Sequence, residues 1–231
     1  MTQRKIDYWV IPPKSNGEFV ARMEAVLEVY AKPYDARCPV LCMDEKPVQL
    51  VKETRPPQEA TKTHPRRVDY EYARVGTANI FMFTEPLSGW RQASVRTRRT
   101  KVDWALEMAK LLEGRYAKCQ SITLVCDNLN THNKGAFYEA FQPDRARKLV
   151  RRIEFCYTPI HGSWLNITEN ELSSLTRQCL SHRRIGDIQT LQQEIAAWST
   201  DVNRRQKGVD WQMKISDARI KLKSIYPKIM T

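Results

Sequence analysis

The order of its strand-like and helix-like segments constrains the fold of this chain more than any other feature. Apolar runs rich in β-branched and aromatic residues predict the strands. They cover residues 38–45, 70–75, 78–85, 90–97, 121–128 and 152–159. After the first strand, two or three form a meander, and the later ones alternate with helices. This order predicts an α/β fold in which one mixed sheet carries helices on both faces.

Capping residues and prolines delimit the predicted helices. The first begins in the capping box SNGE at 15–18, with Ser15 as the N-cap, and ends before Pro33. A second begins at Thr100 or Asp103 and has one apolar stripe. Further helices are expected at about 134–150 with an interruption near Pro143, from Trp164 or Leu165 onwards, and from Asp187 to about Val202.

These elements divide the 231 residues into three parts. Residues 1–35 are predicted to form an N-terminal lead and helix, 36–185 the sheet-containing domain, and 186–231 a helical C-terminal extension. Within the central part, residues 51–68 are rich in Pro, Thr, Lys and Arg. A polar connection of that length inside a compact domain is usually functional or mobile.

Charge and cysteine usage narrow the class of protein. The formal net charge of +12 favours a polyanionic partner, above all nucleic acid, with a ribosomal or merely basic protein as the alternative. No apolar run is long enough for a membrane span, and the N-terminus has no apolar signal-peptide core. The six cysteines lie singly and the histidines are scattered. We therefore expect reduced thiols in the cytoplasm and no zinc site.

Three acidic residues occupy positions at which such a sheet binds ligands. Asp44 is predicted to end the first strand, Asp127 to end the buried strand SITLVC, and Glu169 to lie near the start of a helix. The carboxyl ends of strands border the crevice of an open α/β sheet. Mg²⁺ prefers oxygen ligands, and two such ions about 3.5–4 Å apart can clamp both oxygens of a phosphodiester displacement. The three acids therefore predict a two-metal site that acts on phosphate.

Other readings of these acids stay open. An aspartate at a strand end is often only a turn former or a helix cap, and only the coincidence of three acids in a basic chain favours catalysis. Glu45 is predicted on the face of its strand opposite to Asp44. Glu171, about 200° from Glu169 around the helix, is predicted to lie in solvent.

Two basic clusters, WRQASVRTRRTK and RARKLVRR, are candidates for phosphate contacts. The residues are Arg91, Arg96, Arg98, Arg99 and Lys101 in the first, and Arg145, Arg147, Lys148, Arg151 and Arg152 in the second. Phosphate contacts position a duplex without reading its bases. Any one of these residues is more often merely solvated. Together they predict DNA binding whose log–log salt slope is roughly −0.9 per phosphate neutralised.

A series of motifs in one order resembles a known family. CMDEKP, LVCDNLNTH and YTPIHGSWLNITENE occur together with VDYEY, ANIFMF, WRQASV and the tail VDWQMKISDARIKLKSIYP. From about Tyr8 to Pro227 the chain resembles the catalytic part of bacterial insertion-sequence transposases of the mariner-like superfamily, which carry an Asp-Asp-Glu triad. The resemblance implies a ribonuclease H-like catalytic domain at 36–185 that cuts and joins DNA with metal ions.

The resemblance also implies roles for individual residues. Asp44 matches the first aspartate, Asp127 the second and Glu169 the third acid, each catalytic and metal-binding, with two Mg²⁺ or Mn²⁺ ions as cofactors. Asn128 and His132 are candidates for orienting these ligands, although a structural role for His132 is at least as common. The chain departs from the family at Ile167, where proline is common.

The implied reaction has two stages and several partners. Water first hydrolyses a phosphodiester at the element's end, and the freed 3′-hydroxyl then attacks target DNA, without a covalent protein intermediate. A homodimer assembled on DNA would hold the two ends. Relatives carry an N-terminal helix-turn-helix region; with only a short lead and one helix before the first predicted catalytic strand, we expect that region to be missing here, as in a second reading frame of a split gene or a truncated copy. We therefore expect DNA binding without sequence preference, with a separate helix-turn-helix polypeptide as a further partner, in the bacterial cytoplasm and at the nucleoid when bound.

Two other functions remain as alternatives. The chain could be a catalytically inactive, non-specific DNA-binding remnant of a truncated transposase. It could also be a metal-dependent hydrolase of small phosphorylated substrates, but it has no Gly-rich phosphate loop. The intact Asp44, Asp127 and Glu169 favour the active transposase.

Overall fold

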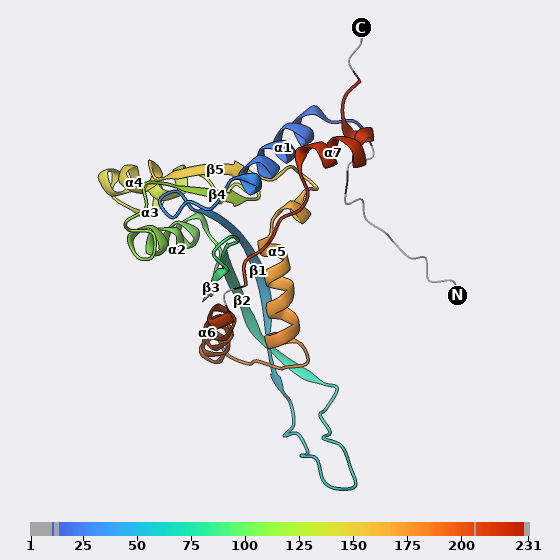
Figure 1. The fold of residues 1–231 in the computed structure, drawn as a ribbon. Coiled ribbons are helices and arrows are strands. Elements are labelled where there is room, and N and C mark those ends of the chain that lie inside the picture. Colours follow the sequence, from blue (N-terminus) through green and yellow to red (C-terminus); the bar gives the residue numbers. More distant parts are fainter. Residues whose placement is uncertain (1–10, 12–13, 206, 229–231) are drawn as a thin grey trace.

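The computed structural model describes residues 11, 14–205 and 207–228. It contains a five-stranded mixed sheet in the order β3-β2-β1-β4-β5 (Figure 1). The strands are β1 (Val40–Glu53), β2 (Tyr72–Glu85), β3 (Trp90–Arg96), β4 (Ile122–Cys126) and β5 (Ile153–Tyr157). β1 to β3 form an antiparallel meander, and β4 and β5 are parallel to β1. The predicted α/β class and the order of meander and alternating helices are confirmed.

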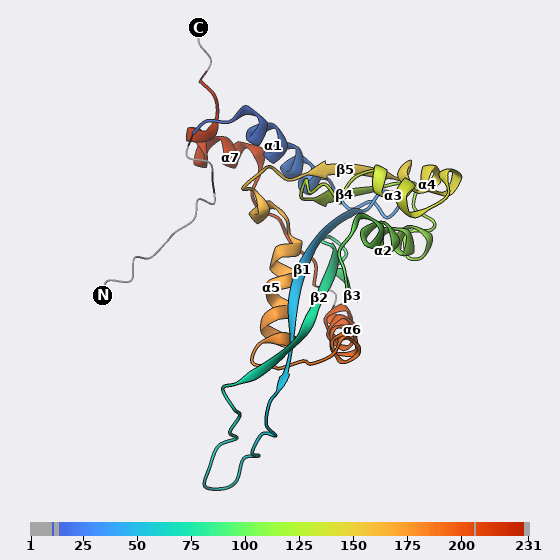
Figure 2. The same ribbon diagram turned by 180° about the vertical axis from the view of Figure 1, so that it is seen from behind.

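Helices lie on both faces of the sheet (Figures 1 and 2). One face is covered by α2 (Lys101–Glu113), α3 (Gly135–Ala140) and α4 (Pro143–Val150), and the other by α1 (Gly17–Ala31), α5 (Thr168–Leu175), α6 (Ile188–Arg205) and α7 (Ile215–Lys221). The 3₁₀ turns η1 (Ser163–Leu165) and η3 (Lys223–Ile225) and the π turn η2 (Thr176–Leu180) complete the elements. None of the helices in this part of the chain is long and apolar enough to cross a membrane.

The side chains of β1 point alternately to the two faces of the sheet, so successive residues pack against different sets of helices. Leu41 and Met43 are buried in the cluster formed with α2 to α4, whereas Cys42 is buried in the cluster formed with α1 and α7. Because successive side chains of a strand point to opposite faces, Asp44 shares the face of Cys42. Glu45 shares the face of Met43, as the sequence predicted.

The hairpin of β1 and β2 is longer than predicted. The two strands pair from Cys42↔Thr84 to Glu53↔Tyr72 and project from the body of the molecule (Figure 1). The predicted break at Gly76 is wrong, because β2 runs through it; its φ of 155°, which favours glycine, lies opposite a register shift at Leu50/Val51. The predicted loop therefore begins only after Glu53, since backbone pairing with β2 keeps the polar end of β1 in the sheet.

Other boundaries also differ from the predictions. The N-cap of α1 is Asn16 rather than Ser15, because the Asn16 side chain accepts from the Phe19 N–H at 3.0 Å. The helix predicted near Trp164 begins as the η1 turn, and α5 starts only at Thr168. Thr100 caps α2 in a capping box with Asp103. Helix α7 was not predicted, and the N-terminal lead lies largely outside the described residues.

Candidate active site

The register between β1 and β4 brings two aspartates to the same level. These strands pair only from Val40↔Thr123 to Cys42↔Val125. Continuing that register by two residues places Asp44 level with Asp127, which directly follows β4. The prediction that Asp44 ends its strand is wrong, because pairing with β2 keeps β1 extended as far as Glu53. The end of β4 instead leaves this part of β1 unpaired on one side.

The loop from β5 to α5 connects the third acid to both aspartates. The Thr158 N–H donates to the carbonyl of Cys126 at 2.9 Å, one residue before Asp127. The buried amide of Asn166 donates to the carbonyl of Met43 at 2.8 Å, one residue before Asp44. Glu169 follows in the first turn of α5, and its N–H donates to the Asn166 carbonyl at 3.0 Å. The loop is thus anchored at both aspartates; the anchoring role of Asn166 was not predicted.

Electrostatics link the three carboxylates. Burial, joined by the negative charges of Glu169 and Asp127, raises the pKa of Asp44 to about 7. The Glu45 N–H, which donates to Asp44 Oδ1 at 2.7 Å, and the charge of His132 act in the opposite direction. A buried carboxyl group whose pKa is raised by desolvation and also by specific neighbouring charges is a candidate functional group.

His132 connects Asp127 to Glu45. Its side chain is only 1% exposed, with Nδ1 at 2.6 Å from Asp127 Oδ1 and Nε2 at 3.1 Å from Glu45 Oε1. Burial disfavours the charged ring, but these two hydrogen bonds outweigh it and raise the pKa of His132 to about 9. Both nitrogens of an imidazolium donate, so the ring fixes the orientation of Asp127. Sequence reasoning missed the contact with Glu45, because that residue comes from the opposite face of β1.

The donor chemistry of this region suits a hard divalent cation. In the part of the chain that the structure describes, no three His, Cys, Asp or Glu side chains are already gathered around one point as ligands. Asp44, Asp127 and Glu169 nevertheless supply only carboxylate oxygens, the ligands that Mg²⁺ and Mn²⁺ prefer. Burial of the Asp44 carboxylate and the negative charges of Glu169 and Asp127 both disfavour its ionised form, and a bound cation would offset them.

One prediction about a charged residue near this site is wrong: Glu171 was expected in solvent, but it is 8% exposed. Arg91, a predicted DNA contact, is 6% exposed and forms a bidentate ion pair with Glu171. Glu171 lies three positions after Thr168 and four before Leu175, both buried, so it belongs to the buried side of α5, whereas Asn170 and Ser173 are exposed.

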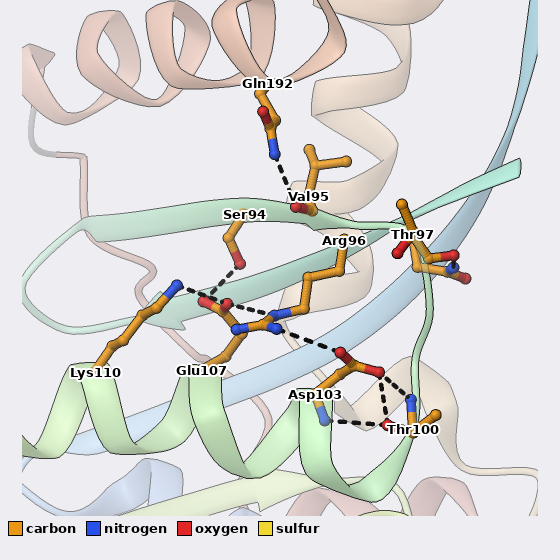
Figure 3. A network of polar contacts seen from close by, with 10 residues as sticks. Ser94, Val95, Arg96, Thr97, Thr100, Asp103, Glu107, Lys110 and Gln192 are labelled. Atoms are coloured by element: carbon orange, nitrogen blue, oxygen red, sulfur yellow. Dashed lines mark hydrogen bonds and ion pairs between the residues drawn. The ribbon is translucent and has the colours of Figure 1, made fainter. Parts of the chain in front are cut away.

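The other basic candidates divide into two groups. Arg96 donates to Glu107 at 2.7 Å and lies 3.3 Å from Asp103 (Figure 3), and Arg152 donates to the carbonyls of Leu112 and Cys119. Both side chains are half-buried and use their guanidinium groups for hydrogen bonds within the protein, which makes them poorer DNA ligands than predicted. The exposed ones are Arg98, Arg99, Arg145, Arg147, Lys148 and Arg151. Lys101 is half-buried and pairs with Glu139 at 3.0 Å, and Asn128 is exposed directly after Asp127.

Comparison with known proteins gives one family and several similar folds. A family model described as DDE superfamily endonuclease matches residues 39–192. The Mos1 mariner paired-end complex with Mn is 14% identical, with a TM-score of 0.53 over 87% of this chain and 60% of that chain. The Mos1 strand transfer complex is 14% identical, with a TM-score of 0.56 over 85% and 58%. The Mos1 paired-end complex with Mg is 12% identical, with a TM-score of 0.54 over 99% and 69%.

Identities this low show a shared fold, and the predicted ribonuclease H-like fold is confirmed. The chain spans about three fifths of the length of the first two Mos1 chains. No curated protein matches it.

Proposed function

Because this chain belongs to the DDE superfamily endonucleases, we propose that it is a transposase catalytic domain. In this proposal it cleaves DNA strands and transfers them during transposition of an insertion sequence, with a divalent metal. The observation that carries the proposal is the pairing of β1 with β4, whose register, continued by two residues, puts Asp44 level with Asp127; the negative charges of Glu169 and Asp127 also contribute to the raised pKa of Asp44. Structures of similar fold include paired-end complexes of Mos1 with Mn or Mg and a Mos1 strand transfer complex.

The proposed site consists of residues that would bind the metal ions and residues that hold those ligands in place. Asp44, Asp127 and Glu169 would hold two Mg²⁺ or Mn²⁺ ions. When bound, such ions supply an activated nucleophile and neutralise charge on the scissile phosphate. His132 holds Asp127 in one orientation through its bond at 2.6 Å, and Asn166 holds the loop that leads to Glu169 against β1. Asn128, exposed beside Asp127, is a candidate to contact the phosphate.

The partners follow from the exposed basic residues. Arg98 and Arg99 precede α2, whereas Arg147, Lys148 and Arg151 lie on or just after α4. We propose that they bind the phosphates of element ends and target DNA. A homodimer formed on DNA would hold two ends, and a separate helix-turn-helix polypeptide would supply end recognition. The place of action is the bacterial cytoplasm, at the nucleoid when DNA is bound.

Incubation with supercoiled plasmid tests the catalytic claim. The purified chain is expected to nick the plasmid with Mg²⁺ or Mn²⁺ and not with a chelator, and Asp127→Ala is expected to abolish nicking. Asp210→Asn, at an exposed position, serves as the matched control. Nicking that survives Asp127→Ala would show that the acids are wrongly assigned. Salt-sensitive DNA binding without nicking would favour the inactive remnant.

Footprinting tests the DNA preference separately. We expect protection spread along any duplex, because phosphate contacts carry no sequence information directly. Protection confined to inverted repeats would contradict the proposal that this chain alone binds without sequence preference.

A further inference from the structure

The first turn of α5 carries two carboxylates, and the proposed metal site uses only one of them. Glu169 is half-buried, whereas Glu171 is buried and paired with buried Arg91. Arg91 Nε donates to Glu171 Oε2 at 2.5 Å, and Nη2 donates to Oε1 at 2.8 Å. A buried ion pair is often no more stabilising than apolar residues of the same volume. Stability alone therefore does not account for this pair.

Besides α5, two chain segments hold the guanidinium of Arg91, and a third holds its backbone. Its Nη1 donates to the Gly89 carbonyl at 2.7 Å, in the turn before β3, and its Nη2 donates to the Lys207 carbonyl at 3.0 Å, after α6. The Asn203 side chain accepts from the Arg91 N–H at 2.8 Å and donates to the Arg91 carbonyl at 2.7 Å. Arg91 is thus a rigid point against which α5 can be oriented.

Packing of Leu172 and Leu175 places α5 against the sheet, and Asn166 Oδ1 accepts from the Thr168 N–H at 3.2 Å at the start of the helix. The Arg91–Glu171 pair adds a directional contact to these. The Thr168 hydroxyl is buried without a hydrogen-bond partner among the described residues. A bidentate Arg–carboxylate pair constrains direction as well as distance. Because Glu169 and Glu171 are about 200° apart around the helix, fixing Glu171 also fixes the direction of Glu169.

We propose that the Arg91–Glu171 pair is a positioning element of the metal site: it sets the rotation of α5 so that Glu169 faces Asp44 and Asp127. This inference rests on the proposed function. Neither Arg91 nor Glu171 touches the metal in this account; they act through Glu169. Loss of residues that orient metal ligands typically costs about 10–100-fold in metal affinity or activity.

The positioning role of the Arg91–Glu171 pair can be tested without DNA or turnover. The test is Mn²⁺ binding to the full chain, measured from the electron paramagnetic resonance signal of free Mn²⁺. Glu171→Gln keeps the shape of the side chain but removes its charge, and we expect it to raise the Kd for Mn²⁺ about tenfold or more. Arg91→Lys keeps the charge but loses the bidentate fork, and we expect the same direction of change.

Glu107→Gln is the matched control. Glu107 is equally buried and accepts from Ser94, Arg96 and Lys110 (Figure 3), but it lies on the opposite face of the sheet from α5. We expect Glu107→Gln to lower the urea midpoint of unfolding and to leave the Mn²⁺ Kd within about twofold. Equal Mn²⁺ affinities for Glu171→Gln, Glu107→Gln and the wild type would overturn the inference.

A further reference, Asp127→Ala, separates failure of the inference from failure of the proposed function. If the wild type binds Mn²⁺ no better than Asp127→Ala, the metal site itself is refuted, and the positioning role with it. If the wild type binds better and Glu171→Gln binds as well as the wild type, only the positioning role is refuted. Circular dichroism checks folding, and if Glu171→Gln does not fold, the milder Arg91→Lys decides.

Discussion

Asp44→Asn is expected to stabilise the metal-free protein at neutral and alkaline pH. Burial and the charges of Glu169 and Asp127 raise the pKa of Asp44 from 3.8 to about 7. The folded state therefore binds this proton more tightly than the unfolded state does. The contribution of this proton to the free energy of unfolding is fully present below pH 3.8 and is lost as the pH rises through about 7. At 1.36 kcal/mol per pKa unit, the loss is about 4 kcal/mol.

Asparagine has no proton to lose, so the variant should escape this loss. Urea unfolding in a chelator, at about pH 4.5 and about pH 8, measures the free energy of unfolding of both proteins. The advantage of Asp44→Asn should be small at the lower pH and approach about 4 kcal/mol at the higher one. Asp210→Asn should show no such growth. Adding Mg²⁺ at the higher pH should stabilise the wild type more than Asp44→Asn. An advantage independent of pH would refute the reasoning.

Three further predictions concern stability, and one concerns DNA. Arg91→Ala leaves Glu171 buried without a partner and should lower the free energy of unfolding by about 3–5 kcal/mol in urea titrations; adding Glu171→Leu should recover part of it. Phe81→Ala empties a fully buried position and should cost about 3–5 kcal/mol by the same assay. Because the pKa of His132 is raised to about 9, its protonated ring stabilises the folded state fully below pH 6.5, and this stabilisation is lost as the pH rises through about 9. His132→Gln should remove this pH dependence of the free energy of unfolding. Arg147→Gln should make the log–log salt slope of DNA binding shallower by about 0.9 if its phosphate contact is real.

The sequence was sufficient to predict the sheet and helices α1 to α6, although not α7, because apolar periodicity reports local burial directly. It was also sufficient to separate Asp44 from Glu45, since side chains in a strand alternate strictly between faces. The length of the hairpin was not predictable in this way. The end of β1 is polar, and its backbone pairing with β2, opposite Gly76, together with contacts from residues 184 and 185, keeps it extended.

The error about Glu171 has a different origin. Helical geometry gives the angle between Glu169 and Glu171, but it does not say which other elements pack around α5. Arg91 lies 80 positions away in sequence, and in a basic cluster it is indistinguishable from residues that face solvent. The link from His132 to Glu45 was missed for the same reason: it joins a loop to a strand 87 positions earlier. Long-range polar pairs leave no periodic signal in a single sequence.

The central claim is that Asp44, Asp127 and Glu169 form one metal-dependent site. Plasmid nicking by Asp44→Asn, Asp127→Asn and Glu169→Gln, measured beside the wild type and Asp210→Asn, tests it most directly. Each of the three variants is expected to fall to the chelator background while still binding DNA, and Asp210→Asn is expected to nick like the wild type. Metal-dependent nicking by any one of the three at the wild-type rate would contradict the claim.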